Sequence, residues 1–131
     1  MNAMVAGLLE AGHNVKVLAI NSNKYQVDID SIPLDYKNKT GIELVYIDLK
    51  VKVLPAFLNL FSSKSLHVQR FISKDFANTL EKILQRQRFD IVQLESLFIA
   101  PYIPLIRRLS SAPILLRAHN IEHLIWHRLQ T

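Results

Sequence analysis

Cysteine is absent from the 131-residue sequence, which excludes disulfide bonds and thiolate metal sites. Its absence fits a protein of the reducing cytoplasm. No apolar run reaches the roughly 18 residues that a membrane-spanning helix needs. The first ten residues lack the basic start and apolar core of a secretion signal. We therefore expect a cytoplasmic protein that touches a membrane at most from the inner face.

Glycine is scarce, and the three glycines Gly7, Gly12 and Gly41 do not form a phosphate-binding loop. The 16 basic residues outnumber the 11 acidic ones, but they are scattered and not interleaved with aromatic residues. Single-stranded nucleic acid binders use such interleaved stripes, so we expect no nucleic acid partner. Half of the residues are hydrophobic, which is enough for one domain with a buried core.

Short apolar runs such as VKVLAI alternate along the chain with segments of helical periodicity. Such alternation predicts an α/β fold: a Rossmann-like, doubly wound parallel sheet of about four strands with helices on both faces. The polar segment Asn21–Thr40, which contains Pro33, is expected to be a connection with little regular structure. The predicted helices are Met1–Ala11, Ser73–Arg88, Pro101–Leu109 and Ile121–Leu129, and the predicted strands are Val15–Ile20, Ile42–Leu49, Ile91–Leu94 and Ile114–Leu116.

Helical spacing also predicts which side chains face the core. Gly12 is expected to end the first helix as a left-handed cap. The predicted core-facing residues are Met1, Val5, Leu8 and Leu9 in the first helix, Phe76, Leu80, Ile83 and Leu84 in the second, and Tyr102, Ile103, Ile106 and Leu109 in the third.

Polar residues follow the third and fourth predicted strands, at the sheet edge where open parallel sheets bind ligands. Glu95 and Ser96 come after the third strand, and the segment RAHNIEH, residues 117–123, comes after the fourth. In that segment a strand turns into a helix whose free amides favour an anion. It is the densest group of candidate functional residues in the chain.

Two interpretations of this segment follow from the residues themselves. His119, Glu122 and His123 match the H-x-x-E-H pattern of a zinc peptidase. A further ligand is lacking and His119 is expected at a strand end, so we predict no metal. In the structural interpretation, Asn120 caps the last helix while His123 and His127 lie on its face.

A third interpretation comes from resemblance. The segments LLEAGHNVKVLAI, FDIVQLESLFIAPYI and ILLRAHNIEHLIWHRL resemble, in that order and spacing, the N-terminal domain of family 4 glycosyltransferases. The first segment is common to many two-domain glycosyltransferases, whereas the other two are more specific. Together they span the chain from residue 2 to about residue 129.

The resemblance implies the GT-B architecture, in which two Rossmann-like domains enclose the active site. The N-terminal domain holds a saccharide or lipid-linked acceptor, and the C-terminal domain holds the nucleotide-sugar donor. The sugar is transferred with retention, without a metal or other cofactor. His119 then corresponds to the catalytic histidine of the cleft, where a neutral imidazole positions the reacting groups. The implied substrate-binding residues are Glu95, Ser96, Arg117, Asn120 and Glu122, although Arg117 could instead hold Glu95 or Glu122 in place.

The sequence departs from the family at both ends. The family's first strand, with its glycine-rich turn, would precede Met1, and its donor-binding domain would follow Thr131. Residues 1–131 are therefore expected to be a partial N-terminal domain that is inactive alone. The lost central strand would leave a gap between two half-sheets or unpaired edges, so we expect self-association, most simply a dimer. A non-catalytic sugar-binding or nucleotide-binding remnant is the alternative function.

The segment Lys50–Arg70 combines apolar residues with Lys50, Lys52, Lys64, His67 and Arg70. This composition is typical of a segment that lies on a membrane surface. Pro55 interrupts it, and core-packing segments have a similar composition, so we favour packing.

Overall fold

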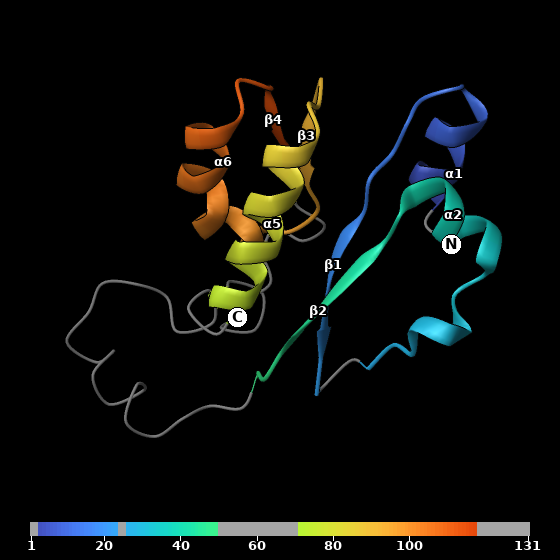
Figure 1. Cartoon of the computed structure of the whole chain (residues 1–131), viewed down its shortest axis with the longest axis horizontal. Coiled ribbons are helices and arrows are strands. Elements are labelled where there is room, and N and C mark those ends of the chain that lie inside the picture. Colours follow the sequence, from blue (N-terminus) through green and yellow to red (C-terminus); the bar gives the residue numbers. More distant parts are fainter. Residues whose placement is uncertain (1–2, 24–25, 50–70, 118–131) are drawn as a thin grey trace, which may run out of the picture. The chain divides into compact units, whose positions relative to one another are not determined.

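In the computed structural model, residues 3–23, 26–49 and 71–117 are described (Figure 1). The chain divides into a first unit, Met1–Val51, and a second unit, Lys52–Thr131. Each unit combines helices with one two-stranded parallel sheet, which confirms a mixed α/β chain. In the described ranges the strands form these two separate pairs, β1–β2 and β3–β4.

The first unit begins with helix α1, Ala3–Glu10, in which Val5 is buried. The predicted glycine cap is confirmed: Gly12 has φ +88°. Its N–H bonds to the Leu9 carbonyl at 3.1 Å, and the next N–H, of His13, reaches back to the Leu8 carbonyl at 3.0 Å. This pair of bonds is the Schellman arrangement, in which a left-handed residue satisfies the last carbonyls of a helix.

Strands β1, Leu18–Ser22, and β2, Glu43–Ile47, pair in parallel with Leu18 opposite Glu43. Two further backbone bonds extend the pairing: the Val17 N–H donates to Thr40 at 3.3 Å, and the Glu43 N–H donates to Val17 at 3.1 Å. The predicted first strand therefore exists, shifted toward its carboxyl end. Most of β1 is half-buried rather than buried on both faces, because among the described residues β1 pairs with β2 alone.

The prediction that residues 21–40 form little regular structure was wrong. They contain a 3-10 turn, η1 (Ile29–Ser31), and a helix, α2 (Leu34–Thr40). Pro33 precedes the helix, where its missing N–H costs no hydrogen bond, and Gly41 at φ +53° ends it. The segment has too few apolar residues to show helical periodicity. Pro33 and Gly41 nevertheless mark the two ends of the helix.

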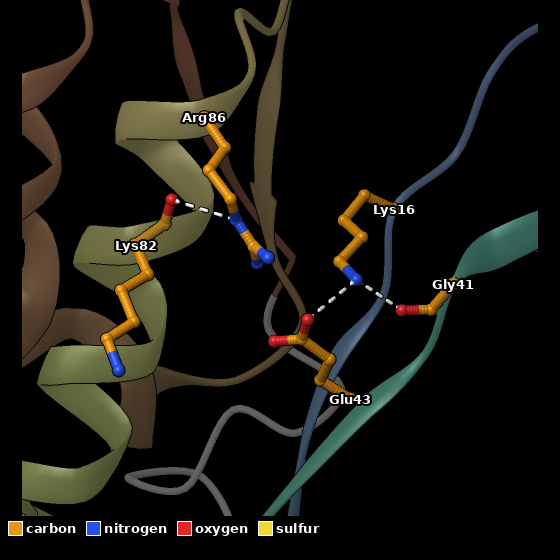
Figure 2. A network of polar contacts seen from close by, with 5 residues as sticks. All are labelled: Lys16, Gly41, Glu43, Lys82 and Arg86. Atoms are coloured by element: carbon orange, nitrogen blue, oxygen red, sulfur yellow. Dashed lines mark hydrogen bonds and ion pairs between the residues drawn. The ribbon is translucent and has the colours of Figure 1, made fainter.

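The Lys16 side chain contacts both the residue that ends α2 and the first residue of β2 (Figure 2). Its ammonium donates a hydrogen bond to the Gly41 carbonyl and lies 3.3 Å from the Glu43 carboxylate. The Lys16 side chain is 18 % exposed and that of Glu43 34 % exposed, so both are partly shielded from water. The left-handed turn at Gly41 is thereby held from outside as well as by its own backbone.

The second unit is organised around helix α5, Lys74–Arg86. Ser73 caps it by accepting a hydrogen bond from the Phe76 N–H at 3.3 Å. At its other end the Arg86 side chain donates to the Lys82 carbonyl (Figure 2). The predicted core face is confirmed, since all four of its residues are buried: Phe76, Leu80, Ile83 and Leu84.

The prediction of a single helix over Pro101–Leu109 placed the start of the helix wrongly. A 3-10 helix, η2 (Leu97–Tyr102), contains Pro101, and α6 (Ile103–Leu109) follows with Pro104 in its first turn. The Ser96 side chain starts the earlier turn by capping it, so the chain is already helical before Pro101. Helix α6 packs against α5 (Figure 1), with Ile106 only 1 % exposed.

The buried Tyr102 side chain ties η2 to the segment that leads into α5. Its hydroxyl donates to the Phe71 carbonyl at 2.5 Å and accepts from the Ser73 N–H at 2.9 Å. Its ring lies 4.7 Å from that of Phe76, measured between centroids. Burial raises the pKa of Tyr102, and the hydrogen bond from Ser73 partly opposes that rise.

Strands β3, Val92–Leu94, and β4, Ile114–Leu116, form the second parallel pair, with Leu94 opposite Leu116. The expected cover on both faces is not found at β4, where Leu115 is 51 % and Leu116 45 % exposed. In the part of the chain that the structure describes, β4 pairs with β3 alone. Among the described helices, none is long and apolar enough to cross a membrane.

Candidate functional site

Glu95 and Arg117 come together at the carboxyl end of the β3–β4 pair. They follow Leu94 and Leu116, which are partners in the parallel register. The Arg117 N–H bonds to the Leu94 carbonyl at 2.8 Å, which carries the pairing one residue past β4. The Arg117 guanidinium then lies 3.8 Å from the Glu95 carboxylate, measured from Nη1 to Oε2. The prediction that these residues share one sheet edge is confirmed.

Gln93 is the third member of this cluster. Its side-chain Nε2 donates to Oε1 of Glu95 at 2.5 Å. Gln93 lies in β3 and Glu95 follows the last residue of that strand, and this hydrogen bond brings the two side chains together. The carboxylate thus contacts an amide through one oxygen and a guanidinium through the other.

Ser96 has a local structural task in this arrangement. Its side-chain oxygen accepts from the Phe98 N–H at 3.2 Å, and its carbonyl accepts from the Ile99 N–H at 3.2 Å. Both bonds begin the 3-10 helix η2. Substrate binding by Ser96 stays a prediction, and the contacts of the described residues show it as a cap.

The remaining predicted site residues, His119, Asn120 and Glu122, lie outside the described residues. The same holds for His123 and His127, for the predicted helix 121–129 and for the segment 50–70. The H-x-x-E-H match and the proposed catalytic histidine therefore stay predictions. In the described part of the chain, no group of three or more His, Cys, Asp or Glu side chains could hold a metal ion.

The ion pair between Glu95 and Arg117 contributes little to stability. Their side chains are 35 % and 51 % exposed, and pairs this accessible to water contribute up to about 1 kcal/mol. What the cluster offers chemically is recognition. A carboxylate accepts up to about four hydrogen bonds, and a guanidinium donates up to about five. A ligand that carries both donors and acceptors, such as a polyhydroxylated molecule, matches this surface.

Gln93 was not among the residues singled out from the sequence. The signal is nevertheless present in the strand, because in VQLE the polar residues Gln93 and Glu95 alternate with apolar ones. A period of two places both on the same face and at the carboxyl end of a parallel strand. When IVQL is interpreted only as a buried apolar strand, the polar side chain of Gln93 is overlooked.

Comparison of the chain with family models, with curated proteins and with solved structures gives no match.

Proposed function

We propose that this chain is the acceptor-binding side of a retaining glycosyltransferase that uses a nucleotide-sugar donor. The observation that carries the proposal is the pairing of β3 with β4. The two segments that most resemble family 4 glycosyltransferases, FDIVQLESL and ILLRAHN, contain these two strands. Their parallel pairing brings Glu95 and Arg117, the polar residues at the strand ends, to one edge.

The pattern of strand pairs supports the finer fold that we propose, a doubly wound parallel sheet. The Rossmann-like order of such a sheet is 3-2-1-4-5. If β1 to β4 are its second to fifth strands, a central first strand separates the pair β1–β2 from the pair β3–β4. These are the pairs observed in the two units. The flavodoxin-like order 2-1-3-4-5 would instead place the third strand beside the fourth, which here means β2 beside β3.

In the proposed reaction, the sheet edge at Glu95 and Arg117 holds a saccharide or the sugar of a lipid-linked acceptor. His119, which follows Arg117 by two residues, is proposed to position the reacting groups as a neutral imidazole. The nucleotide-sugar is proposed to bind to a second Rossmann-like domain, and the reaction to take place at the cytoplasmic side of the membrane.

Transfer by the complete product of the reading frame that encodes this chain tests the proposal. The purified protein is incubated with radiolabelled UDP-sugars and GDP-sugars, together with saccharide or lipid-extract acceptors. We expect labelled product, and His119→Ala should lower turnover by about 100-fold or more while the protein stays folded. His127→Ala is the matched control and should change turnover little.

Two results would contradict the proposal. One is an equal loss of turnover in the His119 and His127 variants, which would assign both histidines to structure. The other is near-stoichiometric zinc in protein purified without added metal, which would favour the peptidase interpretation of the same residues. Binding of saccharides without transfer from any donor would indicate the non-catalytic alternative.

A further inference from the structure

The Gln93 amide has only one orientation that satisfies its neighbour. An ionised carboxylate accepts hydrogen bonds and donates none, so the NH2 group of Gln93 must face Glu95. The 2.5 Å contact between Nε2 and Oε1 has this orientation. The amide oxygen, an acceptor, then projects from the other side of the same carbon. The orientation of the amide is therefore set by the charge on Glu95.

The Glu95 carboxylate is restrained from two directions. Gln93, in the strand that Glu95 follows, contacts Oε1, and Arg117, which follows the neighbouring strand, contacts Oε2 at 3.8 Å. A glutamate on a surface otherwise samples several rotamers, and ordering such a side chain when a ligand binds costs conformational entropy. Restraint before binding removes part of that cost. Gln93 thus affects a ligand through Glu95 without needing to touch it.

We propose that Gln93 is a positioning residue for Glu95, and that the carboxylate held by Gln93 and Arg117 binds a pair of neighbouring hydroxyl groups on the acceptor sugar. This inference rests on the proposed function and adds to it the feature of the sugar that is recognised. Two adjacent hydroxyls can both donate to one carboxylate, and their oxygens can accept from the guanidinium of Arg117. The exposed fractions of the two side chains, 35 % and 51 %, leave this edge accessible to a sugar from water.

The test measures saccharide binding by NMR titration of the same complete gene product that is used in the transfer assay. The probes are methyl glycosides of glucose, galactose and mannose, and the tightest-binding one is compared with its 3-O-methyl derivative. That derivative retains no two neighbouring free hydroxyls on the ring. We expect wild-type protein to bind one of the glycosides and to lose about tenfold or more in affinity for its methylated form.

Gln93→Met keeps the length of the side chain and removes the hydrogen bond. We expect it to weaken binding by about fivefold, and Glu95→Gln to weaken it by about tenfold or more. The matched control is Gln85→Met, because Gln85 also bonds to a glutamate, Glu81, at 3.4 Å, but on α5. Its affinity should equal that of the wild type. In wild-type spectra the Gln93 side-chain amide should show one strongly downfield proton, which Glu95→Ala abolishes and Gln85→Met leaves in place.

The outcomes separate this inference from the proposed function. If Gln93→Met binds as tightly as wild type while Glu95→Gln is weakened, Gln93 does not position the carboxylate, and the inference is overturned although the acceptor site stands. If no glycoside binds but the complete protein transfers sugar, the hydroxyl-pair site is overturned and the transferase stands. If binding falls in Gln93→Met as expected but no donor supports transfer, the inference stands and the transferase fails.

Discussion

The two units of the chain each contain one pair of parallel strands, but different interactions surround the two pairs. In the first unit the strands have five residues each, and the polar residues Ser22 and Thr40 are among the buried ones. Side-chain bonds to the backbone occur in both units, as at Lys16 and Asn21 in the first and at Tyr102 and Arg107 in the second. In the second unit the strands have three residues each, and helix α5 packs against α6 with a wholly apolar buried face.

This difference indicates that short paired strands are sufficient in a unit whose buried core is formed mainly by helices. Three-residue strands form few ladder bonds, so the β3–β4 pair depends on the packing around it. The longer β1–β2 pair has five register positions, and Lys16 adds side-chain contacts where β2 begins. Substitutions in the two units should therefore differ in size and in kind.

The largest effect is expected at Ile106, the most buried large side chain of α6. Ile106→Ala should lower the free energy of unfolding by about 2–5 kcal/mol, because it removes apolar contacts and leaves a cavity between helices. Urea denaturation followed by circular dichroism measures the change. Leu34→Ala is the control, since Leu34 is 70 % exposed and its loss should cost less than about 0.5 kcal/mol. Similar losses in both variants would show that the α5–α6 contact is not what holds the second unit.

Tyr102→Phe comes next. It removes the hydroxyl that bonds to both Phe71 and Ser73, and it should lower the free energy of unfolding by about 1–2 kcal/mol because two part-buried backbone groups lose their partner. Tyr46→Phe serves as the control, since Tyr46 is 53 % exposed. A thermal or urea melt that does not distinguish the two variants would contradict the role of this hydroxyl.

Alkaline pH should act on the same hydroxyl. Burial raises the pKa of Tyr102 above its ordinary value of 10.0, so the folded chain keeps a proton that the unfolded chain has lost. The stability that this proton gives is complete below the unfolded value and disappears as pH rises through the folded value. Urea titrations from neutral pH upward should show the decline. In Tyr102→Phe the decline should be smaller but not absent, because burial also raises the pKa of Tyr36.

Gly7 and Gly12, two of the three glycines of the first unit, should respond to substitution with opposite signs. Gly12→Ala should cost about 1–2 kcal/mol, because φ is +88° there and a side chain is strained in that conformation. Gly7→Ala should instead add about 0.5–1 kcal/mol, since Gly7 lies within α1 and a methyl group there meets, among the described residues, no atom within 4 Å beyond its chain neighbours and the helix's own backbone. Thermal melts of the two variants provide the comparison. A gain at both positions would mean that the cap at Gly12 does not constrain the chain.

The smallest effect is expected at Lys16. Lys16→Met keeps the apolar stem but removes the bond to Gly41 and the ion pair with Glu43, which should cost about 1 kcal/mol or less. Lys39→Met is the control, because Lys39 and Asp35 pair on exposed turns of α2 and contribute about 0.3–0.5 kcal/mol. If raising the salt concentration erases the difference between the variants, the Lys16 contacts are as well screened as those of Lys39.

Sequence periodicity predicts the second unit better than the first, for a physical reason. The residues of α5 alternate between apolar and polar at helical spacing, so both the helix and its four buried residues follow from the sequence. In α2 the sequence LDYKNKT has no such spacing, and Pro33 and Gly41 at its two ends are the signals that mark it. Tertiary packing and local caps decide such short helices, which periodicity does not capture.

The sequence predicts where the candidate site lies, but it does not identify all of the residues that form it. Glu95 and Arg117 follow from the rule that parallel strands share one carboxyl edge, and their contact confirms it. Gln93 was not predicted as a site residue, because the sequence pattern assigned it to the interior of a strand and its side chain was not considered further. The capping bond of Ser96 depends on the exact turn that follows β3, which is set by local backbone geometry and not by residue type alone.

The parallel direction of both strand pairs also has a kinetic consequence. Parallel strands cannot be joined by a tight hairpin, and here the partners Leu18 and Glu43 are 25 residues apart and Val92 and Ile114 are 22 apart. Each pair must close a long loop before its first ladder bond forms, at an entropic cost that no nearby contact repays. Helix α5 needs only neighbouring residues and can form on the microsecond scale. During refolding, far-ultraviolet helical signal should therefore rise before the amide protons of Glu43 and Val92, which bond across the two strand pairs, gain protection from exchange.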